Sequence, residues 1–155
     1  MQDRHQSYPT ICMFGGVKHG KTTLATAMLK VVQHIGATEI KDTQFQQIDP
    51  VSYRITEQLS TLFRTVKFET SGKHYRLIDS ESHADLVKAI IGSSPEIQAA
   101  ILVVRTTEGV TKEITEQIQL ANEIGIRTIF AFLNKVNMAE DLELIDMCQD
   151  ETEEL

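Results

Sequence analysis

Residues 10–22, TICMFGGVKHGKT, hold the pattern that decides the fold. The apolar run at 10–14 predicts a buried strand, and the glycines that follow predict a tight turn. From Lys21 to Ile35 apolar residues recur at helical spacing, and Gly36 is a natural stop for that helix. The stretch therefore predicts a strand, a glycine-rich loop and a helix, in that order.

The loop itself, GGVKHGKT from Gly15 to Thr22, fits the phosphate-binding P-loop pattern of Gly, four residues and Gly-Lys-Thr. Glycines let backbone N–H groups turn inward, and the following helix presents its positive end to the same anion. Lys21 should reach the β- and γ-phosphates and the Thr22 hydroxyl should bind Mg²⁺. We expect nucleotide contacts from Gly15, Gly16, Val17, Lys18, His19, Gly20, Lys21, Thr22 and Thr23. A chance glycine-rich turn before a helix is the alternative, which the strand and helix on either side disfavour.

Strand and helix patterns alternate along the rest of the chain. Strands are predicted at 65–70, 74–79, 100–104 and 127–133, and helices at 84–92, 111–124 and 139–155. A turn through 71–73 would join the first two strands as a hairpin. We therefore expect one α/β domain over residues 1–155, a three-layer P-loop NTPase sandwich with a mostly parallel sheet and one antiparallel edge strand.

Composition narrows the function classes. The 155 residues carry a net charge of −7, so we expect no direct binding of DNA by the molecule as a whole. The polar start lacks a signal peptide, and no apolar run approaches the roughly 20 residues of a membrane span. The lone cysteines Cys12 and Cys148 are predicted to be reduced core thiols, which favours a cytoplasmic protein. Because its apolar runs are short, we expect no membrane binding.

Two further motifs follow predicted strands. Asp79 ends the strand at 74–79, where a carboxylate can hold Mg²⁺ through a water, although a plain strand-end aspartate is an equal alternative. Asn134-Lys135-Val136-Asn137 follows Leu133, at the place where many GTPases carry Asn-Lys-x-Asp. Because ligands of open α/β sheets bind at the carboxyl ends of strands, the agreement of the motifs favours a guanine-nucleotide site.

At these residues the chain resembles the GTP-binding domain of elongation factor Tu and its relatives among the translational GTPases. The resemblance covers nearly the whole chain and includes GGVKHGKTTL, Arg54-Ile55-Thr56, DSESHADLVKAIIGSS from Asp79, AAILVV and FLNKVNM. The family pattern at these places is close to GHVDHGKTTL, GIT, DCPGHADYVKNMI, GAILVV and FLNKCDM.

The resemblance implies roles for individual residues. Thr56 looks like the switch threonine that binds Mg²⁺ and senses the γ-phosphate, and His83 looks like the histidine that orients the attacking water. Val17 and Ile55 look like the apolar gate that screens this histidine. A solvated histidine at a helix start is the alternative for His83. The implied catalytic residues are His83 and Lys21, the implied metal ligands are Thr22, Thr56 and Asp79, and further implied nucleotide contacts are Asp79, Ser82, Asn134, Lys135 and Asn137.

Departures from the family pattern affect the same site. Lys18 replaces an acidic residue of the phosphate loop. Its ammonium either supplies positive charge where the family can use a metal cation or points to solvent, and we slightly favour the solvent-facing position. Ser82 replaces a glycine whose peptide turns between states, and Glu81 adds a negative charge nearby. Asn137 replaces the aspartate that selects guanine. The lost charge-assisted hydrogen bond and the added donor would cost ~2–4 kcal/mol, a ~30- to 1,000-fold loss of affinity, whereas the amide suits xanthine.

The family continues with a further strand, a base-contacting loop, a final helix and two β-barrel domains, so we expect a C-terminally shortened sandwich. Its exposed sheet edge would favour a covering partner, either the ribosome or another protein. The leading hypothesis is binding of GTP or GDP with Mg²⁺ and slow GTP hydrolysis. The alternative is a non-hydrolysing nucleotide-binding or protein-interaction module, a pseudo-GTPase. A P-loop ATPase or kinase, which would prefer ATP, ranks third.

Overall fold

The computed structural model describes residues 9–34, 63–70, 73–80, 82, 84, 86–87, 97–139 and 141–155. The elements in these ranges are β1 (Thr10–Phe14), α1 (Lys21–His34), β2 (Phe63–Thr70), β3 (Lys73–Ser80), β4 (Ile97–Arg105), α3 (Lys112–Glu123), β5 (Thr128–Asn134), the 3₁₀ turn η1 (Val136–Met138) and α4 (Leu142–Glu153). The expected helix at 84–92 lies largely outside the described residues.

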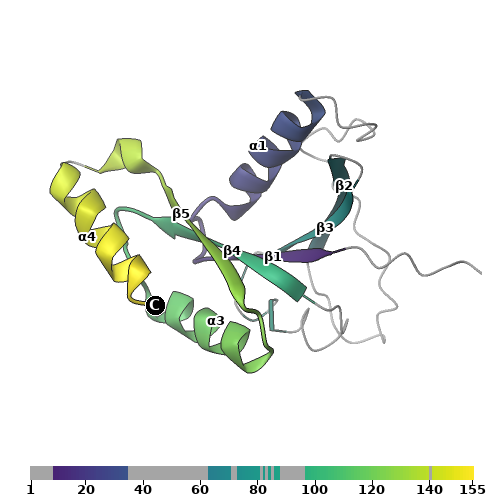
Figure 1. The fold of residues 1–155 in the computed structure, drawn as a ribbon. Helices are drawn as coiled ribbons and strands as arrows, with labels where there is room; N and C mark the ends of the chain where they lie inside the picture. The colour runs from purple at the N-terminus through teal and green to yellow at the C-terminus, as the bar shows by residue number, and fades with distance from the viewer. Residues whose placement is uncertain are drawn as a thin grey trace, which may run out of the picture.

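A five-stranded sheet in the order β2-β3-β1-β4-β5 forms the middle layer (Figure 1). β1 lies between β3 and β4 and runs parallel to both, and β5 runs parallel to β4. β2 pairs antiparallel with β3 in the expected hairpin. This confirms the expected α/β fold with a mostly parallel sheet and one antiparallel edge strand. Because β1, β3, β4 and β5 are parallel, their carboxyl ends share one edge of the sheet.

Alternation along the strands divides the core between the two faces of the sheet. Cys12 and Phe14 of β1 point to the face covered by α3 and α4, whereas Met13 points to the face covered by α1. β4 repeats the alternation, with Leu102 on the first face and Val103 on the second. Both faces of these central strands are therefore buried, which explains why their sequences are continuously apolar. The cysteines are free and buried, as expected.

Helix ends follow from local hydrogen bonds. The Thr111 side chain caps α3 by accepting from the Ile114 N–H at 3.4 Å, and Gly125 follows the helix with a φ of 84°. The Asp141 side chain caps α4 by accepting from the Leu144 N–H at 2.9 Å. These caps satisfy N–H groups that have no partner within the helix.

The cap at Asp141 changes the predicted C-terminal helix. The sequence pattern at 139–155 predicts one helix with Leu142 on its inner stripe, but α4 begins only at Leu142, whose side chain is 78% exposed. Cys148 and Thr152 are the buried residues of α4. Leu142 lies about 120° around the helix from Cys148, so both cannot face the core. The expected inner position of Cys148 is correct and that of Leu142 is wrong.

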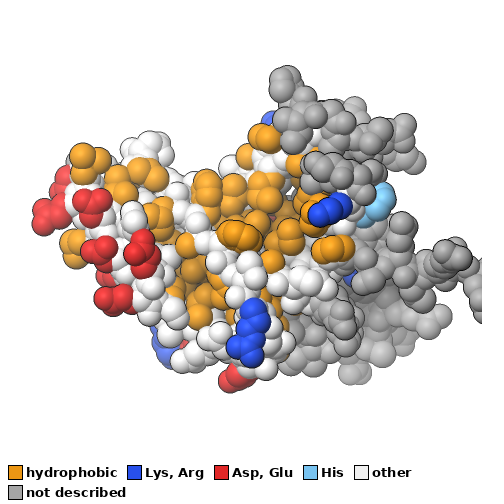
Figure 2. All heavy atoms as spheres, in the orientation of Figure 1, with side chains coloured by type: hydrophobic (Ala, Val, Ile, Leu, Met, Phe, Trp, Pro, Cys, Tyr) orange, Lys and Arg blue, Asp and Glu red, His pale blue; other side chains and the backbone are white. Residues whose placement is uncertain are grey.

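The edge strand β5 has one covered face and one exposed face. Ile129 and Leu133 pack against the core beneath α3 and α4. Phe130 and Phe132 point to the opposite face and are 61% and 43% exposed, and apolar atoms gather over this part of the surface (Figure 2). In the part of the chain that the structure describes, no helix has the length and apolar character needed to cross a bilayer.

Candidate functional site

The loop between β1 and α1 begins and ends with glycines that have positive φ angles, 132° at Gly15 and 98° at Gly20. Both positions also exclude a side chain. A Cβ on Gly15 would collide with the Val103 carbonyl oxygen, and one on Gly20 would collide with the Asn134 side-chain nitrogen. Only glycine combines this conformation with this close approach, so the two glycines set the path of the loop.

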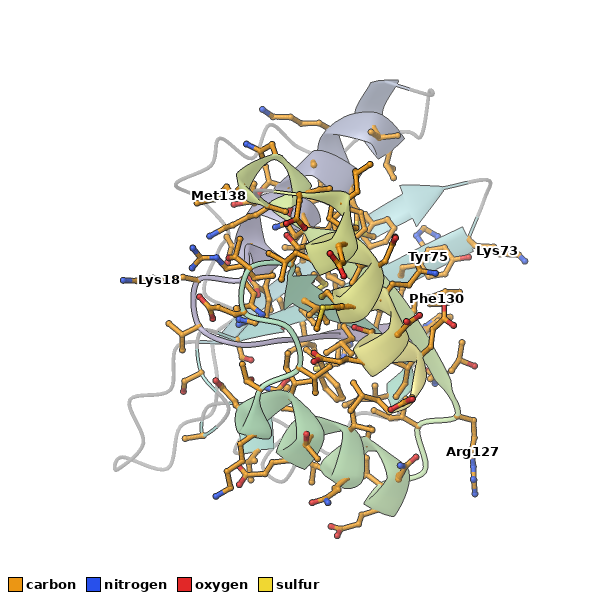
Figure 3. The ribbon with its side chains drawn as sticks, turned by 90° about the vertical axis from the view of Figure 1, so that its left-hand side faces the viewer. Lys18, Lys73, Tyr75, Arg127, Phe130 and Met138 are labelled. Carbon is orange, nitrogen blue, oxygen red and sulfur yellow. The ribbon has the colours of Figure 1, made fainter. Side chains whose placement is uncertain are left out.

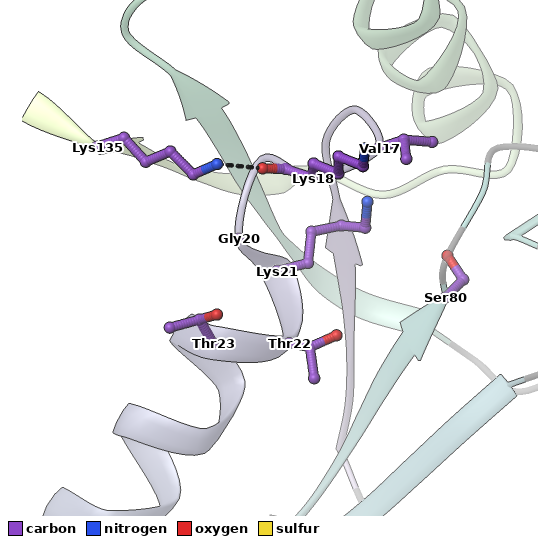
Figure 4. Close-up of a pocket in the computed structure, with 8 residues that line it drawn as sticks. All are labelled: Val17, Lys18, Gly20, Lys21, Thr22, Thr23, Ser80 and Lys135. Atoms are coloured by element: carbon purple, nitrogen blue, oxygen red, sulfur yellow. Dashed lines mark hydrogen bonds between the residues drawn. The ribbon is translucent and has the colours of Figure 1, made fainter. Parts of the chain in front are cut away.

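A pocket of about 370 Å³ opens above this loop (Figure 4). Its lining comes from the loop, the start of α1, the end of β3 and the segment after β5. The lining residues are Val17, Lys18, Gly20, Lys21, Thr22, Thr23, Ser80 and Lys135. Six of these eight residues were expected from the sequence to contact the phosphates, Lys135 was expected to contact the base, and Ser80 was not expected.

The ammonium group of Lys21 lies inside the loop. Its Nζ donates to the carbonyl oxygens of Gly15 at 2.9 Å and Gly16 at 2.8 Å, and the side chain is buried. Lys21 is the first residue of α1, so its charge adds to the positive end of the helix dipole. The loop therefore holds a positive charge at the base of the pocket.

A hydroxyl and a carboxylate meet next to this charge. The Thr22 hydroxyl donates to Asp79 Oδ2 at 2.6 Å. Asp79 is buried and lies within β3, which continues through Ser80, so the strand extends beyond the expected boundary at 79. Burial, and next the Asp79 carboxylate, raise the pKa of the Cys12 thiol well above its ordinary value, so this thiol stays neutral.

The last residue of β5 and the residue after it are bonded directly to the loop. Asn134 Nδ2 donates to the His19 carbonyl oxygen at 2.7 Å, and Asn134 Oδ1 accepts from the Lys135 N–H at 2.8 Å. Lys135 Nζ donates to the Lys18 carbonyl oxygen at 2.7 Å (Figure 4). Lys18 and Lys135 both have left-handed backbone, with φ of 63° and 58°. These bonds join two motifs that lie 115 residues apart in the chain.

The other residues predicted to belong to the nucleotide site lie away from the pocket lining, at its exposed rim, or outside the described residues. The Lys18 side chain is exposed and extends away from the body of the protein (Figure 3). Asn137 is exposed in η1 and does not line the pocket, and Ser82 is half-buried outside the lining. Thr56 and His83 lie outside the described residues.

Gln117 is a loop contact that sequence reasoning missed. Its Oε1 accepts from the Gly15 N–H at 2.6 Å and its Nε2 donates to the Gly15 carbonyl oxygen at 3.4 Å. Gln117 is buried in α3 beside Ile114, Ile118 and Ala121. A polar residue on an otherwise apolar helical stripe was the signal that could have identified it, because a buried amide needs partners.

His19 was expected at the phosphate site, but its ring lies under the loop. The side chain is 1% exposed, and its Nε2 is 3.0 Å from the Glu108 carboxylate. The hydrogen bond with His19 is the largest cause of a lowered pKa of Glu108, desolvation opposes it, and Arg105 lowers this pKa further. Glu108 is a second residue that the sequence alone did not indicate.

A strand, a loop of constrained glycines, a buried loop lysine and a helix at the carboxyl edge of a parallel sheet define a P-loop nucleotide-binding domain. The family model of the elongation factor Tu GTP binding domain matches residues 6–155. The chain belongs to this family of GTP-binding domains, which confirms the resemblance found in the sequence.

We expect Gln117→Ala to destabilise the fold, because the buried Gly15 N–H loses its acceptor. The loss should be about 1–3 kcal/mol in the free energy of unfolding. Gln119→Ala is the matched control on the same helix, because its side chain is exposed, and it should change stability by less than about 0.5 kcal/mol. Denaturant unfolding of the two variants measures the difference, and equal transition midpoints would show that the Gln117 amide does not hold the loop.

Proposed function

We propose that this GTP-binding domain holds the phosphates of GTP or GDP, together with Mg²⁺, in the pocket above the loop Gly15–Thr23, and that it hydrolyses GTP slowly. The observation that carries the proposal is the buried Lys21 ammonium, held by two loop carbonyls at the base of a pocket that opens to solvent. Cytoplasmic localisation is part of the same proposal, supported by two free, buried thiols.

The phosphate contacts follow from the loop. Its backbone N–H groups and the positive end of α1 suit an anion, and Lys21 adds a full charge. On this proposal Lys21 exchanges part of its bonding with the Gly15 and Gly16 carbonyls for phosphate oxygens. Lys18 stays at the rim, where its charge is shared with solvent.

The pair of Thr22 and Asp79 fits a magnesium site. Mg²⁺ prefers hard oxygen ligands, and a hydroxyl and a carboxylate oxygen lie 2.6 Å apart beside the pocket. Thr22 would bind the ion directly and Asp79 through a water, with Thr56 of the first switch as a further ligand. The ion would neutralise charge on the β- and γ-phosphates.

We assign the base contacts to the last residue of β5 and to the segment after it. Asn134 would bond the base and already braces the loop, and the stem of Lys135 would cover the ring. Asn137 would face the 2-position of the purine. Because its amide offers both a donor and an acceptor, we propose weaker selection of guanine than an aspartate gives, with xanthine as a matching base.

The wild-type chain should bind GTP and GDP with micromolar or tighter affinity in the presence of Mg²⁺, measured by calorimetry beside XTP and ATP. Lys21→Ala should weaken binding at least ~100-fold, because a buried charge next to the phosphates is lost. Lys112→Ala is the control, because Lys112 is an exposed lysine on α3. A preference for XTP would identify Asn137 as the base-selecting residue. Binding of none of the four nucleotides would contradict the proposed function.

Hydrolysis would use water as the nucleophile, with His83 orienting it and Lys21 and the loop amides stabilising the developing charge. Ser82 and Glu81 argue for a slow rate, because serine restricts the peptide turn and Glu81 repels the phosphates. If hydrolysis is absent while binding persists, the chain is a non-hydrolysing module.

In a single-turnover assay His83→Ala should lower the GTP hydrolysis rate ~10-fold or more without changing nucleotide affinity, because the attacking water loses its orienting group. His74→Ala on β3 serves as the control, since His74 does not line the pocket. Equal rates for His83→Ala and the wild type would remove His83 from the mechanism.

A second candidate function, recognition of a protein partner, is favoured by the edge of β5. The exposed Phe130 and Phe132 lie on the outermost strand of the sheet, where an extended segment can add as a further strand. The neighbouring α4, LELIDMCQDETE, contains acidic residues and no lysine or arginine. We propose a partner strand with apolar and basic side chains. A second copy fits less well, because two chains of net charge −7 repel each other.

An extended peptide of alternating valine and lysine should protect the amides of β5 from hydrogen exchange, and added salt should weaken this protection. Phe132→Asp should abolish the protection. Ile124→Asp is the matched control at the end of α3, with a side chain 40% exposed against 43% for Phe132. Dimers of the wild-type chain in sedimentation that Phe132→Asp dissolves would instead identify a second copy as the occupant.

A further inference from the structure

The buried ring of His19 lies under the phosphate loop, in contact with the Gly16 backbone. It is 1% exposed and does not line the pocket, so it faces the protein and not the nucleotide site. A Cβ on Gly16 would lie 2.7 Å from the ring nitrogen Nε2, so the Gly16 backbone rests directly on the imidazole. The His19 N–H also donates to the Gly16 carbonyl oxygen at 3.3 Å. The ring therefore packs directly against the loop to which it belongs, so a change in its orientation would displace the Gly16 backbone.

Three groups outside the loop surround the ring. Nε2 lies 3.0 Å from Glu108 Oε2, and Nδ1 lies 3.2 Å from both the Val103 carbonyl oxygen and the Arg105 N–H. A carboxylate can only accept, so Nε2 carries a hydrogen. In the neutral ring Nδ1 then accepts from Arg105. Without Glu108 the Nε2–H tautomer loses its acceptor, and the other tautomer, with Nδ1–H donating to the Val103 carbonyl oxygen, can compete with it.

Glu108 is itself held in place. Its Oε1 accepts from Arg105 Nη1 at 2.6 Å, and its backbone N–H donates to the Arg105 carbonyl oxygen at 3.0 Å. Its two carboxylate oxygens thus bridge Arg105 and His19. The turn that carries Glu108 is tied to α4, because the Val110 N–H donates to Glu151 Oε2 at 3.2 Å.

The pair differs from an ordinary surface ion pair. Glu108 is 41% exposed, and exposed pairs contribute little to stability. His19 is nevertheless almost completely buried, so removal of the carboxylate leaves a buried N–H donor without its acceptor. Loss of this hydrogen bond would therefore affect the loop that packs against the ring, and not the protein surface.

We propose that Glu108 is a positioning residue for the phosphate loop: it selects the tautomer and orientation of His19, and through this ring it places the loop amides of Gly16–Gly20 for phosphate binding. The inference rests on the proposed function for its effect on nucleotide affinity. Its effect on the loop itself does not depend on nucleotide.

Calorimetry with GDP and Mg²⁺ tests the effect on affinity. Glu108→Ala should raise the Kd about 5- to 30-fold, which corresponds to about 1–2 kcal/mol and lies within the range for one buried donor left without an acceptor. Glu108→Gln keeps an acceptor for Nε2–H and should have a smaller effect. Glu116→Ala is the matched control on α3, because Glu116 is 44% exposed and pairs with Lys112 at 3.3 Å, and it should leave the Kd within about twofold. Equal Kd values for Glu108→Ala and Glu116→Ala overturn the proposal.

Nitrogen NMR of the histidine rings gives a readout that does not require nucleotide, with the His19 signal assigned by its loss in His19→Gln. The wild type should show the Nε2–H tautomer of His19. Glu108→Ala should shift the population toward Nδ1–H and move the amide resonances of Gly16–Gly20, whereas Glu116→Ala should change neither. Failure of the wild type to bind any nucleotide would overturn the proposed function alone. Unchanged tautomer and loop resonances in Glu108→Ala would overturn the positioning role, whatever the nucleotide result.

Discussion

The buried ammonium of Lys21 is the interaction on which the rest of the site depends. A charge in the interior is strongly unfavourable unless it is hydrogen-bonded, and here the carbonyl oxygens of Gly15 and Gly16 provide the bonds. Both carbonyls can point at one atom only if the chain turns tightly, which the positive φ angles of Gly15 and Gly20 permit. The shape of the loop and the burial of its cation are therefore a single constraint.

A loop of this kind does not hold its shape alone, and later segments of the chain brace it. Gln117 pairs with the Gly15 peptide, Glu108 contacts the buried His19 ring, and Asn134 contacts the His19 carbonyl. The partners lie 102, 89 and 115 residues from the loop in sequence. Gln117 lies in α3, Asn134 ends β5 and Glu108 lies in the turn between β4 and α3, so the shape of the proposed phosphate site depends on how these segments pack around the loop. A loop prepared in this way loses less conformational entropy on binding an anion.

The carboxyl edge of the sheet and its β5 edge differ in the chemistry of their side chains. The carboxyl edge of the sheet gathers cationic and hydroxyl groups around the pocket, whereas the side edge formed by β5 exposes aromatic side chains beside the acidic α4. The first edge suits a small anion and the second suits an apolar, basic chain. The two edges are linked, because Asn134 ends β5 and also bonds to the loop through the His19 carbonyl oxygen.

Local patterns in the sequence were sufficient for much of this picture. The strand–loop–helix start, the alternation of elements, the hairpin and the family resemblance predicted a mostly parallel sheet with one antiparallel edge strand, because periodicity and glycine placement are local properties of the sequence. Tertiary structure decided the rest. The Asp141 cap fixes where α4 begins, and packing of Cys148 and Thr152 against the core leaves Leu142 on the outer side of the helix, although its apolar side chain predicted an inner position.

The sequence analysis also missed Gln117 and Glu108 as residues that contact the phosphate loop. The polar Gln117 on an apolar helical stripe signals a buried amide that needs partners, but its partner Gly15, and the contact of Glu108 with His19, exist only once the fold brings these residues together across about 100 residues of chain. The sequence by itself determined the class of fold and the position of the phosphate loop. Only the tertiary structure decided which side chains hold that loop in shape, because those contacts exist only after the sheet has aligned the carboxyl ends of its strands.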